Sequence, residues 1–186
     1  MNATQLKIIG IVSMTIDHIG YFLFPQMTVL RMIGRLAYPI FAYMIAEGCR
    51  YTRNKVRYFC TMFAIACACS AATYFAERAL YQSIFTTFSC AMLLIFALDT
   101  AEKTAEGARK ILWDASAALL VFLYFSVFQL RMIPGLETDY GFLGIITPVL
   151  VWLGRSKAEK LLGLALGLSL LSAEFGAVQF CSLAAV

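Results

Sequence analysis

The chain has 186 residues, of which 61% are hydrophobic and only 14% charged, and its mean hydropathy is +0.79. Soluble domains carry about 25% charged residues, so this composition excludes an ordinary soluble domain and predicts an integral membrane protein. The formal net charge of +4 does not indicate nucleic-acid binding, because the basic residues lie between apolar runs rather than along one stripe.

The succession of apolar runs predicts an all-α fold: a polytopic transmembrane helix bundle of about seven to eight spans, some of them short or broken. We expect one integral membrane domain over residues 1–186. The candidate spans are 6–24, 30–49, 57–76, 83–98, 112–130, 142–154 and 158–172. An eighth run begins near Ala177 and is still apolar at Val186, so we expect that the chain lacks a C-terminal span or has a disordered end, unless residues 158–186 form one long element containing Glu174.

The first run contains two ionisable residues, Asp17 and His18, and His18 is the single histidine of the chain. Ionisable groups at membrane depth are costly unless they are paired or face a cavity, so they indicate a functional site by default. Histidine is also the side chain whose unperturbed pKa lies closest to neutral pH. Adjacent residues on a helix point about 100° apart, so Asp17 is not expected to orient His18 directly.

Arg35 in the second run is expected at the same depth as His18, roughly 8–9 Å below the outer surface. The short connection between the two runs makes their helices antiparallel neighbours, so Arg35 and Asp17 are expected to meet. Asp17 shares a face with Gly10, Ser13 and Gly20, which favours close helix packing. Two interpretations of Asp17 remain open: an ion pair with Arg35 that locks two helices, or a role in chemistry.

His18 has a functional interpretation as a general base or a covalent acyl carrier, with Arg35 or Arg31 holding an anionic group. Pro39 interrupts the second run and predicts a kink that frees a backbone carbonyl, although such a kink can also serve packing alone. Glu47, near the end of this run, either pairs with Arg50 or takes part in function.

Basic residues gather in three connections, where Arg50, Arg53, Lys55 and Arg57 form one cluster, Lys103, Arg109 and Lys110 a second, and Arg155, Lys157 and Lys160 a third. Such residues stay on the cytoplasmic side, so the N-terminus and these three loops are predicted to be cytoplasmic. The first cluster is either an ordinary topology signal or a binding loop for a phosphate-bearing cofactor, because arginine grips phosphate with a two-pronged fork.

The segment from Glu137 to Gly141 precedes a short apolar run that contains Pro148. Asp139 in this segment either caps a helix N-terminus or faces a substrate at the outer mouth of the bundle. The six cysteines lie in or at the ends of apolar runs without a CxxC spacing, so we predict small apolar side chains and no metal site.

Several of these segments together resemble the TraX family, named after a membrane acetylase that modifies the pilin N-terminus in conjugation; pilin is the substrate of only one member. The resemblance covers residues 6 to about 155 and is strongest over 6–54. Its pieces are Leu6-Lys7-Ile8-Ile9, Ile16-Asp17-His18-Ile19-Gly20, the run Ile33 to Tyr43, Ala46-Glu47-Gly48, Tyr51-Thr52-Arg53-Asn54 and Thr138 to Gly144. The family usually continues into a Tyr-Asn-Gly loop and a final span with a Tyr-Pro-x-His element, both of which this chain lacks.

The resemblance implies an acetyl-CoA-dependent acetyltransferase of the bacterial inner membrane, distantly similar to multispanning membrane acyltransferases. Its expected acceptor is an amine or hydroxyl of a membrane or exported molecule, such as a pilin-like peptide or a glycan. The implied catalytic residues are His18, Asp17 and Arg35. The residues expected to bind acetyl-CoA are Arg31, Glu47, Arg53, Asn54 and Lys55, and those expected to meet the acceptor are Asp139 and Tyr140.

Two other hypotheses fit the same residues. Asp17, His18 and Arg35 can serve as the proton relay of a small proton-coupled transporter. They can also only lock helices together in a purely structural membrane subunit. The expected partners are membrane lipid and the small acceptor, with no nucleic acid, and the sequence gives no oligomeric state.

Overall fold

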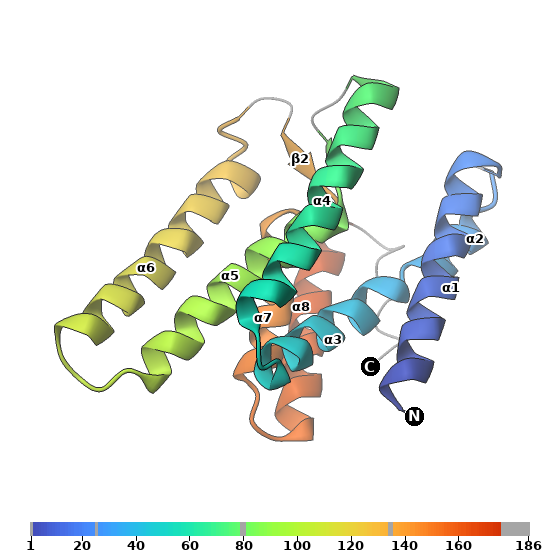
Figure 1. Ribbon diagram of the computed structural model, residues 1–186. Coiled ribbons are helices and arrows are strands. Elements are labelled where there is room, and N and C mark those ends of the chain that lie inside the picture. Colours follow the sequence, from blue (N-terminus) through green and yellow to red (C-terminus); the bar gives the residue numbers. More distant parts are fainter. Residues whose placement is uncertain (1, 25, 79–80, 134–135, 176–186) are drawn as a thin grey trace. The chain divides into compact units, whose positions relative to one another are not determined.

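The computed structural model describes residues 2–24, 26–78, 81–133 and 136–175. Within these ranges most residues are helical, which confirms the predicted all-α class (Figure 1). The chain divides into two compact units, residues 1–47 with 150–186, and residues 48–149. The single membrane domain expected over residues 1–186 stays a prediction.

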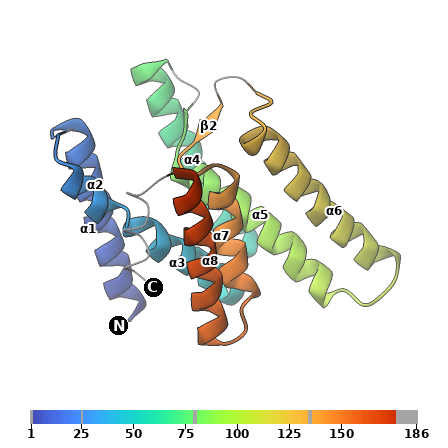
Figure 2. The same ribbon diagram turned by 180° about the vertical axis from the view of Figure 1, so that it is seen from behind.

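The first unit opens with a close helix pair, α1 (Ala3–Phe22) and α2 (Thr28–Gly34), which lie side by side in Figures 1 and 2. Gly10, Ser13 and Gly20 on the predicted small-residue face of α1 are all buried, and Gly20 contacts α2 while Gly10 faces Ile40 and Phe41. A Cβ at Gly20 would lie 2.7 Å from the Cβ of Leu30, so only glycine allows the helices to come this close.

The second run of the sequence forms two helices, α2 and α3 (Ala37–Tyr51), with a break at Arg35 and Leu36. Pro39 lies in the first turn of α3, and its ring nitrogen cannot donate to the carbonyl four residues earlier. That carbonyl belongs to Arg35, so the proline accounts for the position of the break. The predicted interruption by Pro39 is confirmed.

The first unit also holds the last turn of α7 (Gly141–Leu153) and α8 (Lys157–Phe175), which lie beside each other in Figure 2. A Cβ at Gly163 of α8 would lie 2.6 Å from the Leu150 carbonyl oxygen. Ser156 and Glu159 cap the start of α8: the Glu159 backbone N–H donates to Ser156 Oγ, and Glu159 accepts from the Arg155 backbone N–H at 2.8 Å. The hydrogen bonds from Arg155 and Ser156 hold the pKa of Glu159 below its usual range.

The second unit contains three consecutive long helices, α4 (Lys55–Glu77), α5 (Ile84–Lys103) and α6 (Ala108–Tyr124). Helix α5 packs against both α4 and α6. A five-residue π-helix, η1 (Phe125–Gln129), extends α6. The short strands β1 (Tyr81–Gln82) and β2 (Glu137–Thr138) pair in parallel, with Gln82 opposite Thr138, and bring the start of α7 beside the start of α5.

Four helical segments of the described chain are long and apolar enough to cross a membrane: Thr28–Tyr51, Lys55–Phe75, Ile84–Lys103 and Ala108–Gln129. The chain is therefore a membrane protein, although these four are fewer than the seven to eight predicted spans. Helix α1 has 20 residues, but Lys7, Asp17 and His18 dilute its apolar content. Helix α7 has only 13 residues, and the run from Ala177 lies outside the described residues.

Candidate active site

Asp17 lies on the face of α1 that packs against α2. Its Oδ2 forms an ion pair with Arg31 Nη1 at 3.5 Å. The Arg31 side chain is 30% exposed and the Asp17 side chain 25% exposed. A Cβ at Gly34 would collide with the Asp17 side chain, so the glycine makes room for the carboxylate. Asp17 Oδ1 is buried without a hydrogen-bond partner in the structure.

Arg31 forms an ion pair with Asp17 that the sequence analysis did not predict, since it expected Arg35 there. Arg31 lies one helical turn before Arg35, and Arg35 directly follows the last residue of α2. Arg31 also lies over the ring of Tyr21, 5.1 Å from its centroid, which further fixes the guanidinium.

The His18 side chain is exposed, whereas the Asp17 side chain is only 25% exposed. His18 Nδ1 lies 2.8 Å from the backbone carbonyl of Met14. A carbonyl oxygen can only accept, so Nδ1 carries the proton in this contact and Nε2 is the ring nitrogen left to act as a base.

Arg35 lies at the break between α2 and α3, where it directly follows the last residue of α2. Its side chain is half-buried, and its backbone N–H donates to the Arg31 carbonyl at 3.1 Å. Asp17, Arg31 and Arg35 thus belong to the same two-helix element of the first unit.

Glu47, near the end of α3, binds a residue that the sequence analysis did not select. Lys160 Nζ of α8 donates to Glu47 Oε1 at 2.7 Å, a contact that the sequence analysis did not predict. The Lys160 side chain is only 9% exposed and that of Glu47 is 26% exposed. A lysine just inside an apolar run was the available signal, but the sequence analysis assigned it to a cytoplasmic loop.

The connection before α4 holds three of the residues predicted to bind a cofactor. Asn54 caps α4 by accepting a hydrogen bond from the Arg57 backbone N–H at 2.9 Å. Lys55 forms an ion pair with Asp99 of α5 and lies over the Phe96 ring. Arg53 is exposed.

Asp99 was also absent from the predicted site. It binds Lys103 Nζ at 2.8 Å as well as Lys55, so it joins the first and second basic clusters at one end of the second unit. This contact agrees with the predicted placement of both clusters on the same side of the membrane.

The two residues predicted to meet the acceptor lie between β2 and α7. Tyr140 is 7% exposed, and Asp139 is half-buried. Helix α7 begins at Gly141, whose φ of +53° is in the left-handed region that favours glycine. Tyr140, rather than Asp139, is therefore the residue directly before the helix.

Among the described residues, no three histidine, cysteine or acidic side chains lie close enough together to hold a metal ion. The features that remain are an acid–arginine ion pair between α1 and α2, a histidine next to that acid, and basic connections at helix ends. Together with the apolar helices, they define an α-helical membrane protein with ionisable residues inside an apolar segment.

The family model described as TraX protein matches residues 2–185, which is nearly the whole chain, and the chain belongs to the TraX family. It is also similar to an uncharacterized protein, RP591, of Rickettsia prowazekii (strain Madrid E), with 50% identity over 52 residues. That match covers 28% of this chain and 21% of the relative, so it spans about a fifth of the relative's length. No solved structure matches the chain.

Proposed function

We propose that this protein is a membrane-embedded acetyltransferase that moves an acetyl group from cytoplasmic acetyl-CoA to an amine or hydroxyl of an exported or membrane acceptor. Membership of the TraX family carries this proposal, because the family resemblance implies acetylation of a pilin N-terminus. A pilin-like peptide is therefore the first acceptor to consider.

The tautomer of His18 supports its role as the general base. Nε2 takes the proton from the acceptor nitrogen or oxygen as that atom attacks the thioester carbonyl. The new C–N or C–O bond forms, the C–S bond breaks, and the CoA sulfur leaves with the proton that His18 returns. In the covalent variant of this mechanism, Nε2 itself accepts the acetyl group before the acceptor does.

The two arginines take separate roles in this proposal. Arg35 stabilises the negative charge that develops on the thioester oxygen, because a guanidinium is a strong charged donor in a low-dielectric site. Arg31 remains with Asp17, and this ion pair positions α2 beside α1. Asp17 is then a positioning residue rather than a direct partner of His18.

We propose that the protein lies in the inner membrane with its N-terminus and its basic connections in the cytoplasm. Acetyl-CoA then enters from the side of these basic connections. Arg53 and Arg57 are exposed and suited to bind its phosphates. Lys55 can join them only by exchanging Asp99 for a phosphate, and Glu47 reaches the cofactor only by leaving Lys160.

The test is transfer of a radiolabelled acetyl group from acetyl-CoA to a pilin-like peptide by the purified protein in liposomes. His18→Ala should lower the rate by about 10²–10⁴-fold, the usual contribution of a general base. The His18→Ala protein should still fold, because the His18 side chain is exposed and its Nδ1 contacts a carbonyl of its own helix. Thr15→Ala is the matched control, since Thr15 is also exposed and also bonds a carbonyl of α1.

Transfer by wild type and by Thr15→Ala, together with loss in a folded His18→Ala protein, supports the proposal. Equal transfer by all three proteins removes His18 from the mechanism. Absence of any transfer, hydrolysis or acetyl-CoA binding by folded wild-type protein contradicts the acetyltransferase function itself.

A further inference from the structure

The start of α5 carries a serine that does not do what an N-cap serine ordinarily does. Ser83 is the N-cap residue of α5, but its side chain makes no capping hydrogen bond, whereas Asn2 caps α1 and Asn54 caps α4. Ser83 Oγ is buried, and it has no hydrogen-bond partner in the described part of the chain. This hydroxyl is therefore left over from the local structure of the helix.

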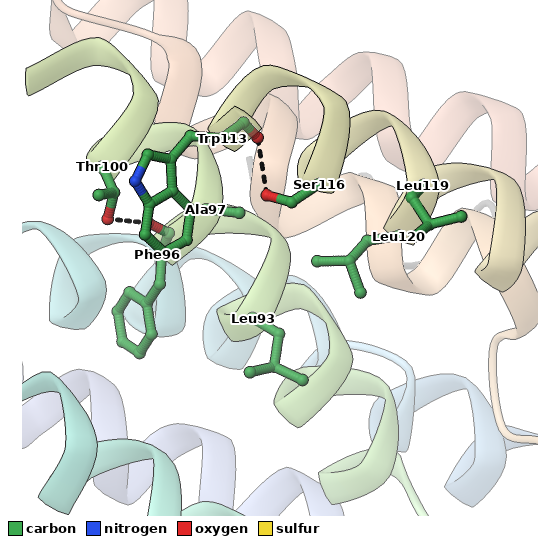
Figure 3. Close-up of a pocket in the computed structure, with 8 residues that line it drawn as sticks. All are labelled: Leu93, Phe96, Ala97, Thr100, Trp113, Ser116, Leu119 and Leu120. Carbon is green, nitrogen blue, oxygen red and sulfur yellow. Dashed lines mark hydrogen bonds between the residues drawn. The ribbon is translucent and has the colours of Figure 1, made fainter. Parts of the chain in front are cut away.

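Thr87, one turn further along α5, carries a second hydroxyl of this kind. Serines and threonines in helices commonly donate to a carbonyl of their own helix. Figure 3 shows two examples in the apolar groove between α5 and α6, where Thr100 and Ser116 each donate to such a carbonyl at 2.7 Å. The Thr87 side chain is fully buried, yet its Oγ1 has no partner among the described residues. Thr87 Oγ1 is therefore not bonded within its own helix.

Thr138 of β2 carries the third hydroxyl, and its Oγ1 is also buried without a partner among the residues that the structure describes. Strand pairing places Thr138 opposite Gln82, which directly precedes Ser83, and β2 also contacts α5. Ser83 and Thr87 are four residues apart and so lie on one face of α5. The three hydroxyls thus gather where β2 meets the first turn of α5.

The nearest polar side chain does not satisfy this group of hydroxyls. Gln82 Oε1 already accepts from Ser70 Oγ at 2.8 Å and from Thr86 Oγ1 at 3.3 Å, which uses both lone pairs of that oxygen. Helix α5 also has the length and apolarity of a membrane span, and lipid offers no hydrogen bonds. Because a buried hydroxyl without a hydrogen bond is costly, the junction calls for a polar ligand.

The charges around the junction favour an uncharged ligand. The first backbone N–H groups of α5 carry partial positive charge, and no acidic residue lies in the first turn of this helix, which disfavours a cation. Glu137 and Asp139 flank Thr138 in the sequence, which disfavours an anion. The three hydroxyl oxygens are shielded from solvent, so the ligand is also small. A water molecule fits this description, because it needs only about 10–15 Å³ and two to four polar partners.

We propose that Ser83, Thr87 and Thr138 bind a buried water molecule that bridges the start of α5 to β2. Each hydroxyl can donate to the water or accept from it, so one water serves all three. The chain continues from Thr138 into Asp139 and Tyr140, the residues expected to meet the acceptor, and the water thus holds the segment from which they extend. The proposal does not depend on acetyl transfer, and its test measures stability rather than activity.

The test is a double-mutant cycle read as the melting temperature of the purified full chain in detergent. Thr87→Val and Thr138→Val each remove one hydroxyl and keep the side-chain volume. Each should lower the melting temperature by about 2–4 °C, as the loss of a buried hydrogen bond does in a chain of this size. The double variant should lose little more than either single one, because the first substitution already releases the water.

Thr147→Val is the matched control. Thr147 is also fully buried, but its Oγ1 donates to the Leu143 carbonyl at 2.9 Å. The helix backbone still uses that carbonyl in the variant, so the melting temperature should fall by less than in Thr87→Val. If Thr87→Val does not fold, Ser83→Ala takes its place in the same cycle with Thr138→Val.

Melting temperatures that stay unchanged or rise in both single variants would overturn the proposal, because they would mean that the hydroxyls bind nothing. Fully additive losses would overturn it too, since the two hydroxyls would then have separate partners. Wild-type protein should melt at the same temperature in sodium chloride and in choline chloride. A stabilisation by sodium that Thr87→Val abolishes would identify a cation as the ligand and contradict the water.

Discussion

At the scale of single residues, the best-defined charged contact is the one between Lys160 and Glu47. The lysine side chain is nearly buried and the glutamate is partly exposed, so the two partners do not depend on the contact equally. A buried ion left without its partner is far costlier than a partly hydrated one. This asymmetry distinguishes a buried pair from an ordinary surface salt bridge.

Glu47→Leu should therefore destabilise the protein by about 3–5 kcal/mol, because it leaves the buried ammonium of Lys160 unpaired. Lys160→Met should cost less, since the carboxylate it leaves behind still reaches water. The double variant should recover most of the loss, because no unpaired charge remains. The free energy of unfolding, measured by denaturing-detergent titration, checks all three, and a larger loss for Lys160→Met than for Glu47→Leu contradicts the argument.

At the scale of helices, the contact between α1 and α2 depends on glycine. Gly34 faces the Asp17 side chain, and a Cβ there has no space. Gly10 of α1 faces α3 instead, where a Cβ would meet the edge of the Phe41 ring at 3.0 Å. The ring edge can shift, whereas the base of the Asp17 side chain is fixed to α1.

Gly34→Ala should cost about 1–3 kcal/mol of stability through overpacking and should weaken the Asp17–Arg31 ion pair. Gly10→Ala is the matched control and should cost less, because alanine also favours the helix. Thermal unfolding of both variants in the same detergent provides the comparison. A Gly34→Ala protein as stable as wild type would mean that α1 and α2 do not pack this closely.

The helices show how much of the fold could be predicted from the sequence. The helix pair α1–α2, the small-residue face of α1 and the interruption by Pro39 all follow from local patterns, and each is present in the structure. The ion pair between Arg31 and Asp17 was not predicted, because the local pattern does not distinguish two arginines one helical turn apart. Lys160 and Asp99 were missed because their partners lie 113 and 44 residues away, beyond any local pattern.

At the scale of the whole molecule, ion pairs show which helix ends lie together within each unit. In the second unit, Lys55 meets Asp99, so the start of α4 and the end of α5 share one end. In the first unit, Glu47 meets Lys160, so the end of α3 and the start of α8 share one end. The basic connections lie at these ends, so the bias of lysine and arginine toward the cytoplasm predicts that both ends face the cytoplasm.

This arrangement predicts the labelling of single cysteines in a variant whose six native cysteines are replaced by alanine or serine. Arg53→Cys and Glu106→Cys should react with a membrane-impermeant maleimide only after cell lysis. Met132→Cys, at an exposed position after η1, should react in intact spheroplasts. Reaction of Arg53→Cys in intact spheroplasts would reverse the predicted orientation.

The break at Arg35 and Leu36 has an electrostatic consequence. It creates a new helix beginning at Ala37, and the first backbone N–H groups of any helix carry a partial positive charge. No acidic residue lies in the first turn of α3 to neutralise them. This helix start lies inside a segment apolar enough to cross a membrane. The broken helix thus places partial positive charge in a low-dielectric medium, which favours any group that becomes negative there.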